Sequence, residues 1–75
     1  MDATQLKVKE TARIIKIHCP IKLKRRLFQM GIYEQALIRF DRRTPLGDPL
    51  IFEVEHCQFA LRKSLAKQIE VRADE

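Results

Sequence analysis

Residues 50–61 read LIFEVEHCQFAL, and this segment carries the strongest indication of how the chain folds. Apolar and polar residues alternate in both halves of it, and only His56 separates the halves. A period of two is typical of strands that bury one face. The pattern therefore predicts a tight β-hairpin. Cys57 begins the apolar face of the second strand, which favours a small buried residue at that position.

A loop and another strand are predicted on the N-terminal side of this hairpin. The loop, TPLGDP at residues 44–49, holds two Pro, a Gly and an Asp, a composition that interrupts a strand. Before it, alternation predicts a strand on which Arg39 and Asp41 face outward. The opposite face of that strand is predicted to carry Ala36, Ile38 and Phe40.

A first strand and a helix are predicted still earlier in the chain. Residues 11–17 are rich in β-branched side chains, and a strand there places Ile15 and Ile17 on one face. The helix follows Pro20, which suits a first helical turn, and ends at Gly31, which suits a left-handed C-terminal cap. Its apolar stripe is Leu23, Leu27 and Met30. Its opposite face carries Lys22, Arg25, Arg26 and Gln29.

The C-terminal part completes the predicted architecture. We predict one helical turn over residues 63–67, a last strand containing Ile69 and Val71, and a polar tail over residues 72–75. Small sheets of five strands avoid exposed edges by closing into a barrel. We therefore predict a mainly β fold, a five-stranded SH3-like barrel with one helix inserted after the first strand. An open sheet packed on that helix, of the ferredoxin-like kind, is the alternative.

Length and composition limit the class of protein. The 75 residues are enough for one domain, predicted to span residues 1–75 with a core over about residues 6–71. The longest stretch without a charge, residues 27–33, is much shorter than the about 20 residues of a membrane-spanning helix. The N-terminal residues lack the apolar segment of a signal peptide, so we expect a cytoplasmic protein.

Motifs of common enzyme classes are missing from the sequence. The loop at residues 44–49 lacks the Gly-Lys-Ser/Thr pattern of a phosphate-binding loop, and Ser64 is the only serine. Glu53 and Glu55 share one strand face, as a catalytic pair of carboxylates would, but solvated alternation explains them better. We therefore predict that the protein is not an enzyme.

The net charge of +5 comes from one segment. Residues 16–26 hold five bases and no acid, whereas residues 38–75 hold seven of each. Such a face suits nucleic-acid phosphates, an acidic protein or the inner membrane surface, or it is simply solvated. Small barrels that bind RNA usually expose aromatic side chains for stacking. Here we expect only Tyr33 to be exposed, because four aromatic residues are assigned to the core, namely Phe28, Phe40, Phe52 and Phe59.

Both His and both Cys of the chain occur as two His-Cys pairs, His18-Cys19 and His56-Cys57. Two imidazoles and two thiolates would suit Zn²⁺ or a similar ion if they converged. Neighbouring residues of a strand point to opposite faces, however, which disfavours both members of a pair as ligands. A disulfide between the two Cys is not indicated either. We therefore expect no cofactor beyond weak transition-metal binding.

Four motifs occur in order at compact spacing: KRRLFQMGI at 24–32, TPLGDPL at 44–50, FALRKS at 59–64 and IEV at 69–71. Together they resemble the ferrous iron transport protein A (FeoA) family. They are also similar to the C-terminal SH3-like domain of iron- and manganese-dependent repressors. The family usually has Gly close to positions held here by Lys9, Gln35 and His56. If these positions need positive φ, the three residues carry strain or adopt different turns.

The resemblance implies a function in bacterial ferrous iron uptake. In that family the partner is ferrous iron transport protein B, a membrane transporter whose cytosolic domain hydrolyses GTP. An accessory protein docked there would modulate transport and would reach the membrane only through its partner. From charge placement we assign the docking surface to Lys22, Arg25, Arg26, Leu46, Gly47, Asp48, Arg62 and Lys63. The alternatives are a nucleic-acid-binding barrel and a metal-sensing domain, the latter with the ligands His18, Cys19, His56 and Cys57.

Overall fold

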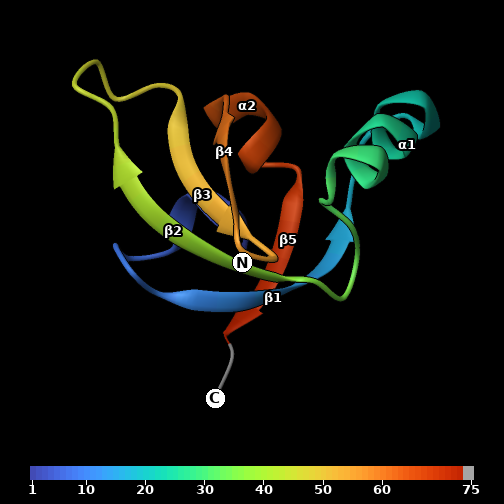
Figure 1. Cartoon of the computed structure of the whole chain (residues 1–75), viewed down its shortest axis with the longest axis horizontal. Coiled ribbons are helices and arrows are strands. Elements are labelled where there is room, and N and C mark those ends of the chain that lie inside the picture. The colour runs from blue at the N-terminus through green and yellow to red at the C-terminus, as the bar shows by residue number, and fades with distance from the viewer. Residues whose placement is uncertain (74–75) are drawn as a thin grey trace.

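Five antiparallel strands form one sheet in the order β4-β3-β2-β1-β5, and the sheet coils on itself around a single core (Figure 1). The computed structural model describes residues 1–73, so the last two residues of the predicted polar tail lie outside it. The elements are η1 (Ala3–Gln5), β1 (Thr11–Ile17), α1 (Ile21–Met30), β2 (Leu37–Arg43), β3 (Leu50–Val54), β4 (Cys57–Leu61), α2 (Lys63–Ala66) and β5 (Ile69–Ala73). The predicted mainly β fold, with its helix after the first strand, is confirmed.

The predicted hairpin is formed by β3 and β4. The register pairs Phe52 with Phe59 and Val54 with Cys57, which leaves a two-residue turn at Glu55 and His56. Both turn residues have positive φ, 49° and 70°. Two-residue turns with positive φ at both positions match the right-handed twist of the flanking strands. One prediction here is wrong: Cys57 is exposed, at the turn end of the edge strand β4.

Strand β2 contains an irregularity that changes which side chains face inward. The β2–β3 register shifts between Phe40 and Arg42, so strict alternation is broken there. Asp41, predicted to face outward, is only 6% exposed. Its carboxylate forms an ion pair with Lys9 and accepts hydrogen bonds from Arg42 Nη1 at 2.9 Å and Gln58 Nε2 at 2.8 Å. These donors compensate for the burial of the charge.

A second register shift lies in β1, between Ile14 and Lys16. Ala12 and Ile14 are buried before the shift and Ile17 after it, whereas Ile15 is only half-buried. The prediction that Ile15 and Ile17 share one face is therefore wrong. The extra residue of a bulge moves the side chains that follow it to the other face of the sheet.

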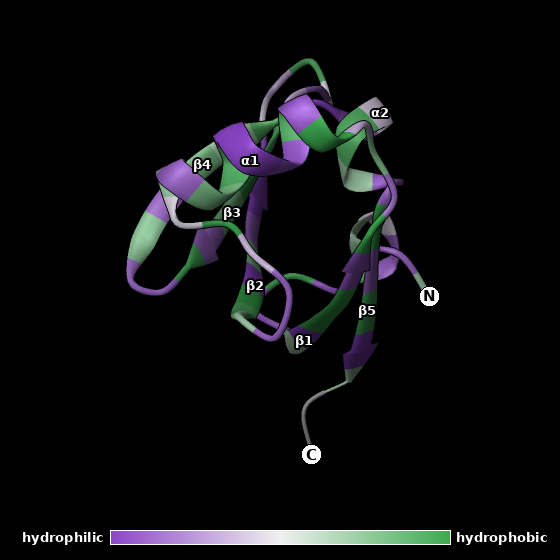
Figure 2. Cartoon of the chain, turned by 90° about the vertical axis from the view of Figure 1, so that its right-hand side faces the viewer, coloured by the Kyte–Doolittle hydropathy of each residue, from purple (hydrophilic) through white to green (hydrophobic). Residues whose placement is uncertain are grey.

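Helix α1 begins directly after Pro20 and ends at Gly31, whose φ of 105° is the predicted left-handed cap. Leu27 is the one buried residue of the helix, and Leu23 is half-buried against the core. Two predictions here are wrong, because Phe28 is 65% exposed and Met30 is 48% exposed. Phe28 follows Leu27 by one position, so the helical period turns it away from the barrel. Figure 2 shows hydrophobic and hydrophilic segments alternating along this helix at the edge of the molecule.

The core is built from apolar residues of every strand, with Phe40 and Phe52 as its largest members. Their ring centroids are 5.4 Å apart. The N-terminus also contributes: the 3₁₀ helix η1 buries Ala3, and Leu6 follows it into the core. Hydrogen bonding ties this segment to the last strand, since Val71 N donates to Met1 O at 2.8 Å. Within residues 1–73, none of the helices is long and apolar enough to cross a membrane.

Lys9, Gln35 and His56, where the resemblance leads us to expect either strain or different turns, all have positive φ. The values are 70° at Lys9, 81° at Gln35 and 70° at His56. The backbone therefore keeps left-handed turns at these positions although the side chains have a Cβ. Each such residue carries a cost of about 1–2 kcal/mol relative to a right-handed conformation.

Replacing Gln35 with Gly should stabilise the fold by about 0.5–1 kcal/mol, because relief of the left-handed strain exceeds the added entropy of the unfolded chain. The backbone bonds of Gln35, from its N to Ile14 O and from Arg13 Nη1 to its O, do not depend on its side chain. Urea unfolding measures the change. The matched control is Gln29→Gly on the exposed face of α1, which should destabilise by about 1 kcal/mol. A loss of stability in Gln35→Gly would contradict the strain argument.

Removing the charge of Asp41 should make stability less dependent on acidic pH. The hydrogen bond and positive charge of Lys9, followed by the charges of Arg42 and Arg39, hold the Asp41 pKa below its ordinary value despite burial. A lowered folded-state pKa contributes stability above the unfolded-state value, near pH 4, and that contribution disappears as the pH falls through the folded-state pKa. Asp41→Asn should therefore unfold at a lower temperature than the unaltered protein at pH 7, and the difference should shrink toward pH 2. An equal difference at both pH values would contradict this.

Candidate functional site

The loop between β2 and β3 and the start of α2 form one surface, which we call the loop–α2 surface. It consists of Leu46, Gly47, Asp48, Arg62 and Lys63, five of the eight residues predicted for docking. Asp48 Oδ1 accepts a hydrogen bond from Lys63 N at 3.0 Å, which joins the loop to the helix. Within the loop, Gly47 N donates to Thr44 O at 2.8 Å, and Gly47 has a φ of 85° that favours glycine.

Leu46 is the most exposed large apolar residue of the described chain, at 93%. Its loop is closed by a second hydrogen bond, from Thr44 Oγ1 to Pro49 O at 2.8 Å. The Nζ of Lys63 lies over Gly47, 3.9 Å from where a Cβ would stand, and Arg62 is exposed beside it. The loop–α2 surface therefore presents one apolar side chain with two cations, held on a hydrogen-bonded loop.

The other three predicted docking residues, Lys22, Arg25 and Arg26, are exposed on α1. No hydrogen bond or ion pair among residues 1–73 joins α1 to the loop–α2 surface. Figure 1 shows α2 between the β2–β3 loop and α1. The predicted docking residues thus form two surfaces instead of one.

The sequence analysis missed that α1 also exposes Ile21 and Phe28. The signal was present, because Ile21, Arg25 and Phe28 are spaced by four and three residues and so follow one line along a helix. Residue type alone predicts Phe28 in the core, whereas its position on the helix places it on the exposed side.

An ion pair and a hydrogen bond at Glu34 connect α1 to the barrel. Lys24 Nζ lies 2.8 Å from Glu34 Oε2, and the same oxygen accepts a hydrogen bond from Ile17 N at 3.1 Å. The hydrogen bond from Lys24, and then that from Ile17, lower the pKa of Glu34. These residues border a pocket of about 260 Å³, lined by Ile17, Lys24, Phe28, Ile32, Tyr33 and Glu34.

Tyr33, predicted to be exposed, is half-buried. Its ring centroid lies 5.8 Å from that of Phe28, in a tilted arrangement. Its hydroxyl donates to Glu55 Oε1 at 3.1 Å, and this acceptor raises the pKa of Tyr33. Tyr33 thus links α1 to the β3–β4 turn.

The two His-Cys pairs occupy different ends of the sheet. His18 follows β1, and its Nε2 lies 2.8 Å from Glu70 Oε1, which lowers the pKa of Glu70. In the register of the sheet, Cys57 is opposite Val54. Val54 is opposite Ile38 of β2, and Ile38 is opposite Ala12 of β1. Six residues of strand, about 20 Å, separate Ala12 from His18. Across residues 1–73, no three His, Cys, Asp or Glu side chains cluster so as to hold a metal ion.

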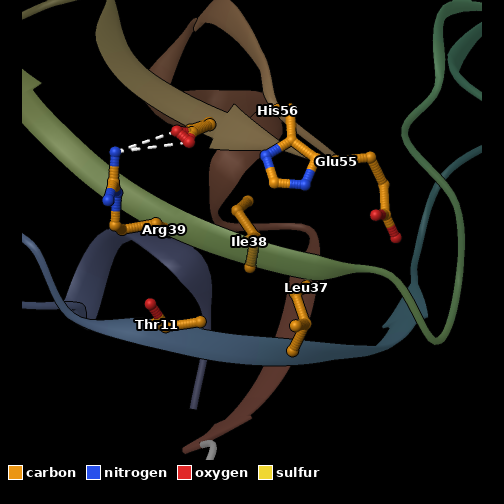
Figure 3. A pocket seen from close by; sticks show the side chains of 7 residues that line it. Thr11, Leu37, Ile38, Arg39, Glu55 and His56 are labelled. Carbon is orange, nitrogen blue, oxygen red and sulfur yellow. Dashed lines mark hydrogen bonds and ion pairs between the residues drawn. The ribbon is translucent and has the colours of Figure 1, made fainter.

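A second pocket, of about 140 Å³, lies between the β3–β4 turn and the start of β2 (Figure 3). At the edge of this pocket, Arg39 Nη2 donates hydrogen bonds to the carboxylate of Glu53, at 2.8 Å to Oε2 and 3.3 Å to Oε1. Glu55 and His56 lie on the opposite rim. Glu53 is thus neutralised by Arg39 and Glu55 is bound to Tyr33, so the two carboxylates have separate partners and do not act as a pair.

The family model for the FeoA domain matches residues 1–73. The chain belongs to the FeoA domain family. This family is associated with ferrous iron transport, as the structure of iron(II) transport protein A from Clostridium thermocellum illustrates. This FeoA domain superposes on that structure with a TM-score of 0.89 and 30% identity, covering 97% of this chain and 45% of that one. The chain thus spans less than half of that relative.

A second solved relative is FeoA from Stenotrophomonas maltophilia, determined in complex with zinc. It shares 29% identity and a TM-score of 0.74 over 96% of this chain and 89% of its own. That protein is described as a prokaryotic SH3 domain protein and a candidate activating factor of bacterial ferrous iron transport. Its description confirms the predicted SH3-like class for the FeoA fold.

The resemblance to metal-dependent regulators is confirmed at the level of the fold. The structure of ScaR with bound Cd²⁺ matches 99% of this FeoA domain and 35% of the regulator, with a TM-score of 0.84 and 22% identity. No match was found among curated proteins.

Asp48→Ala should loosen the loop–α2 surface without unfolding the barrel. The Lys63 amide loses its acceptor, so its hydrogen exchange should become about fivefold faster, the equivalent of roughly 1 kcal/mol. NMR exchange at single amides measures this. Asp48→Asn keeps an oxygen acceptor and should leave the exchange close to that of the unaltered protein. Unchanged exchange in Asp48→Ala would show that the bond does not hold the loop.

Proposed function

We propose that this FeoA domain is a cytoplasmic, non-catalytic accessory of ferrous iron uptake that docks on the cytosolic part of ferrous iron transport protein B and modulates transport. Membership of the FeoA family supports the connection to iron transport. The description of the Stenotrophomonas maltophilia relative as a candidate activating factor supports a modulating role.

Leu46 is the observation that carries the proposal. A leucine side chain that is 93% exposed on a hydrogen-bonded loop gains free energy when a partner covers it, and it loses little conformational freedom in doing so. Interfaces are commonly centred on such apolar anchors, with polar groups at the rim.

Arg62 and Lys63 supply the polar rim of this surface. Both are exposed beside Leu46, so they favour an acidic patch on the partner. We therefore assign docking to the loop–α2 surface and not to α1, because the loop residues and the α2 residues are joined by the bond from Lys63 N to Asp48.

The non-catalytic part of the proposal rests on the chemistry of the two pockets. The smaller one is bordered by an Arg39–Glu53 ion pair, and the larger one by a Lys24–Glu34 ion pair. Glu53 and Glu34 are each held by a cation, and Glu55 of the smaller pocket accepts a hydrogen bond from the Tyr33 hydroxyl, so all three lining carboxylates are engaged by other side chains.

Binding of the purified cytosolic part of the transporter tests the docking surface. Leu46→Ser should weaken binding about tenfold or more, as expected for an anchor residue. The double variant R62E/K63E should weaken it as well and reduce its salt dependence. The matched control is R25E/R26E, which makes the same change in net charge on α1 and should bind nearly as the unaltered chain does. Undiminished binding of both Leu46→Ser and R62E/K63E would refute the assignment.

A further inference from the structure

Helix α1 has an apolar side that the barrel does not cover. Ile21 is 61% exposed and Phe28 is 65% exposed, although Leu27 of the same helix is buried. Ile21 and Phe28 are seven residues apart, which is about two helical turns, so they lie one above the other. They form an apolar ridge along one flank of α1, where the ring of Phe28 also contacts Tyr33 next to the barrel. Both views show the helix at the edge of the molecule (Figures 1 and 2).

Positive charge borders this ridge. Arg25 lies between Ile21 and Phe28 along the helix, Lys22 lies about 100° around the helix from Ile21, and Arg26 lies on the far side from Phe28, all three exposed. The helix holds no acidic residue, and the nearby Glu34 is neutralised by Lys24. Among residues 1–73, no ion pair involves Lys22, Arg25 or Arg26. One unpaired cation, Arg25, therefore stands beside the two exposed apolar side chains, and Lys22 and Arg26 lie further around the helix.

We propose that the outer face of α1 binds the surface of an anionic lipid bilayer. Ile21 and Phe28 enter the boundary between headgroups and acyl chains, Arg25 contacts lipid phosphates beside them, and Lys22 and Arg26 add positive charge that attracts the anionic surface. A helix with large apolar side chains on one side and cations beside them has the composition of interfacial membrane helices. This inference does not rest on the proposed docking to the transporter, and it replaces the expectation that the domain reaches the membrane only through its partner.

A bilayer suits this face better than a nucleic acid or an acidic protein does. A phosphate backbone would not bury the apolar surface of Ile21 and Phe28. Proteins that bind single-stranded nucleic acids stack successive bases on several aromatic side chains, whereas α1 exposes one ring. A protein partner would favour shaped pockets and paired polar groups, whereas the three cations of α1 extend freely without a fixed geometry. In a bilayer the lipid phosphates are mobile, so they can bind cations that have no fixed geometry. The hydrocarbon below them can take up the exposed apolar groups.

The loop–α2 surface and the face of α1 share no residue, so both can be occupied at once. The helix is ten residues long, about 15 Å, and lies along the edge of the barrel. One short helix with a few cations gives weak, reversible attachment. We therefore expect binding that strengthens with the anionic lipid content and weakens with salt.

The chain contains no Trp, so a single introduced indole reports on its own surroundings. F28W places it on the proposed contact face, and the matched control L46W places it on the loop–α2 surface. With vesicles of phosphatidylglycerol and phosphatidylethanolamine, F28W fluorescence should shift to the blue and be quenched by brominated acyl chains. L46W should show neither change. Vesicles of phosphatidylcholine alone should leave both proteins unchanged. Circular dichroism of each variant confirms that it is folded.

Charge reversal provides the second test, in proteins that keep Phe28. R25E/R26E should lower sedimentation with the anionic vesicles at least about tenfold. R62E/K63E changes the net charge equally and should leave most of the binding intact. The vesicles contain no protein, so failure here is separate from failure of the transporter docking.

Three results would overturn the proposal. One is an unshifted F28W spectrum with the anionic vesicles. Another is equal loss of lipid binding in the two charge-reversal variants, which would indicate net charge alone. The third is binding of mixed-sequence RNA, or of the transporter's cytosolic part, that is lost in R25E/R26E while no lipid binding is found. That result would assign the face of α1 to a macromolecule other than the bilayer.

Discussion

The stacking of Phe40 on Phe52 is the contact on which the other features depend. The two residues pair directly in the β2–β3 register, both are almost fully buried, and their ring centroids lie 5.4 Å apart. Burial of each ring contributes about 2–3 kcal/mol. A slip of one residue in either strand would turn the ring of that strand outward, so this pair fixes the register of the two strands. The register in turn fixes where the β2–β3 loop leaves the sheet and presents Leu46.

Helix α1 is held differently from the strands. One buried leucine, one half-buried leucine and the Lys24–Glu34 ion pair attach it, together with the Phe28–Tyr33 contact. These contacts leave exposed the side of α1 that carries Ile21 and Arg25, together with much of Phe28. In this chain the free side carries both apolar residues and cations, which is why its chemistry resembles that of a membrane-surface helix.

Exposed cations of the chain therefore occur on two separate surfaces, the loop–α2 surface and helix α1. Lys63 lies over Gly47, next to Leu46 in the chain, whereas Arg25 stands beside Ile21 and Phe28 on α1. In each place a cationic group borders an exposed apolar side chain, and that combination gives a surface specificity that net charge alone lacks. Two other cations have structural partners, because Lys9 pairs with Asp41 and Arg39 pairs with Glu53.

The sequence alone determined the strands, the helix limits at Pro20 and Gly31, the hairpin and the family, because these follow from local periodicity and from residues with special backbone preferences. It also singled out Lys9, Gln35 and His56 as positions with either left-handed strain or a different turn, and the structure has positive φ at all three and also at Glu55. Only the tertiary structure decided that Asp41 is buried, that Ile14 and not Ile15 faces the core, and that Phe28 and Cys57 are exposed. A bulge depends on the partner strand, and the burial of a helix or edge strand depends on what covers it. Neither is encoded in the local pattern.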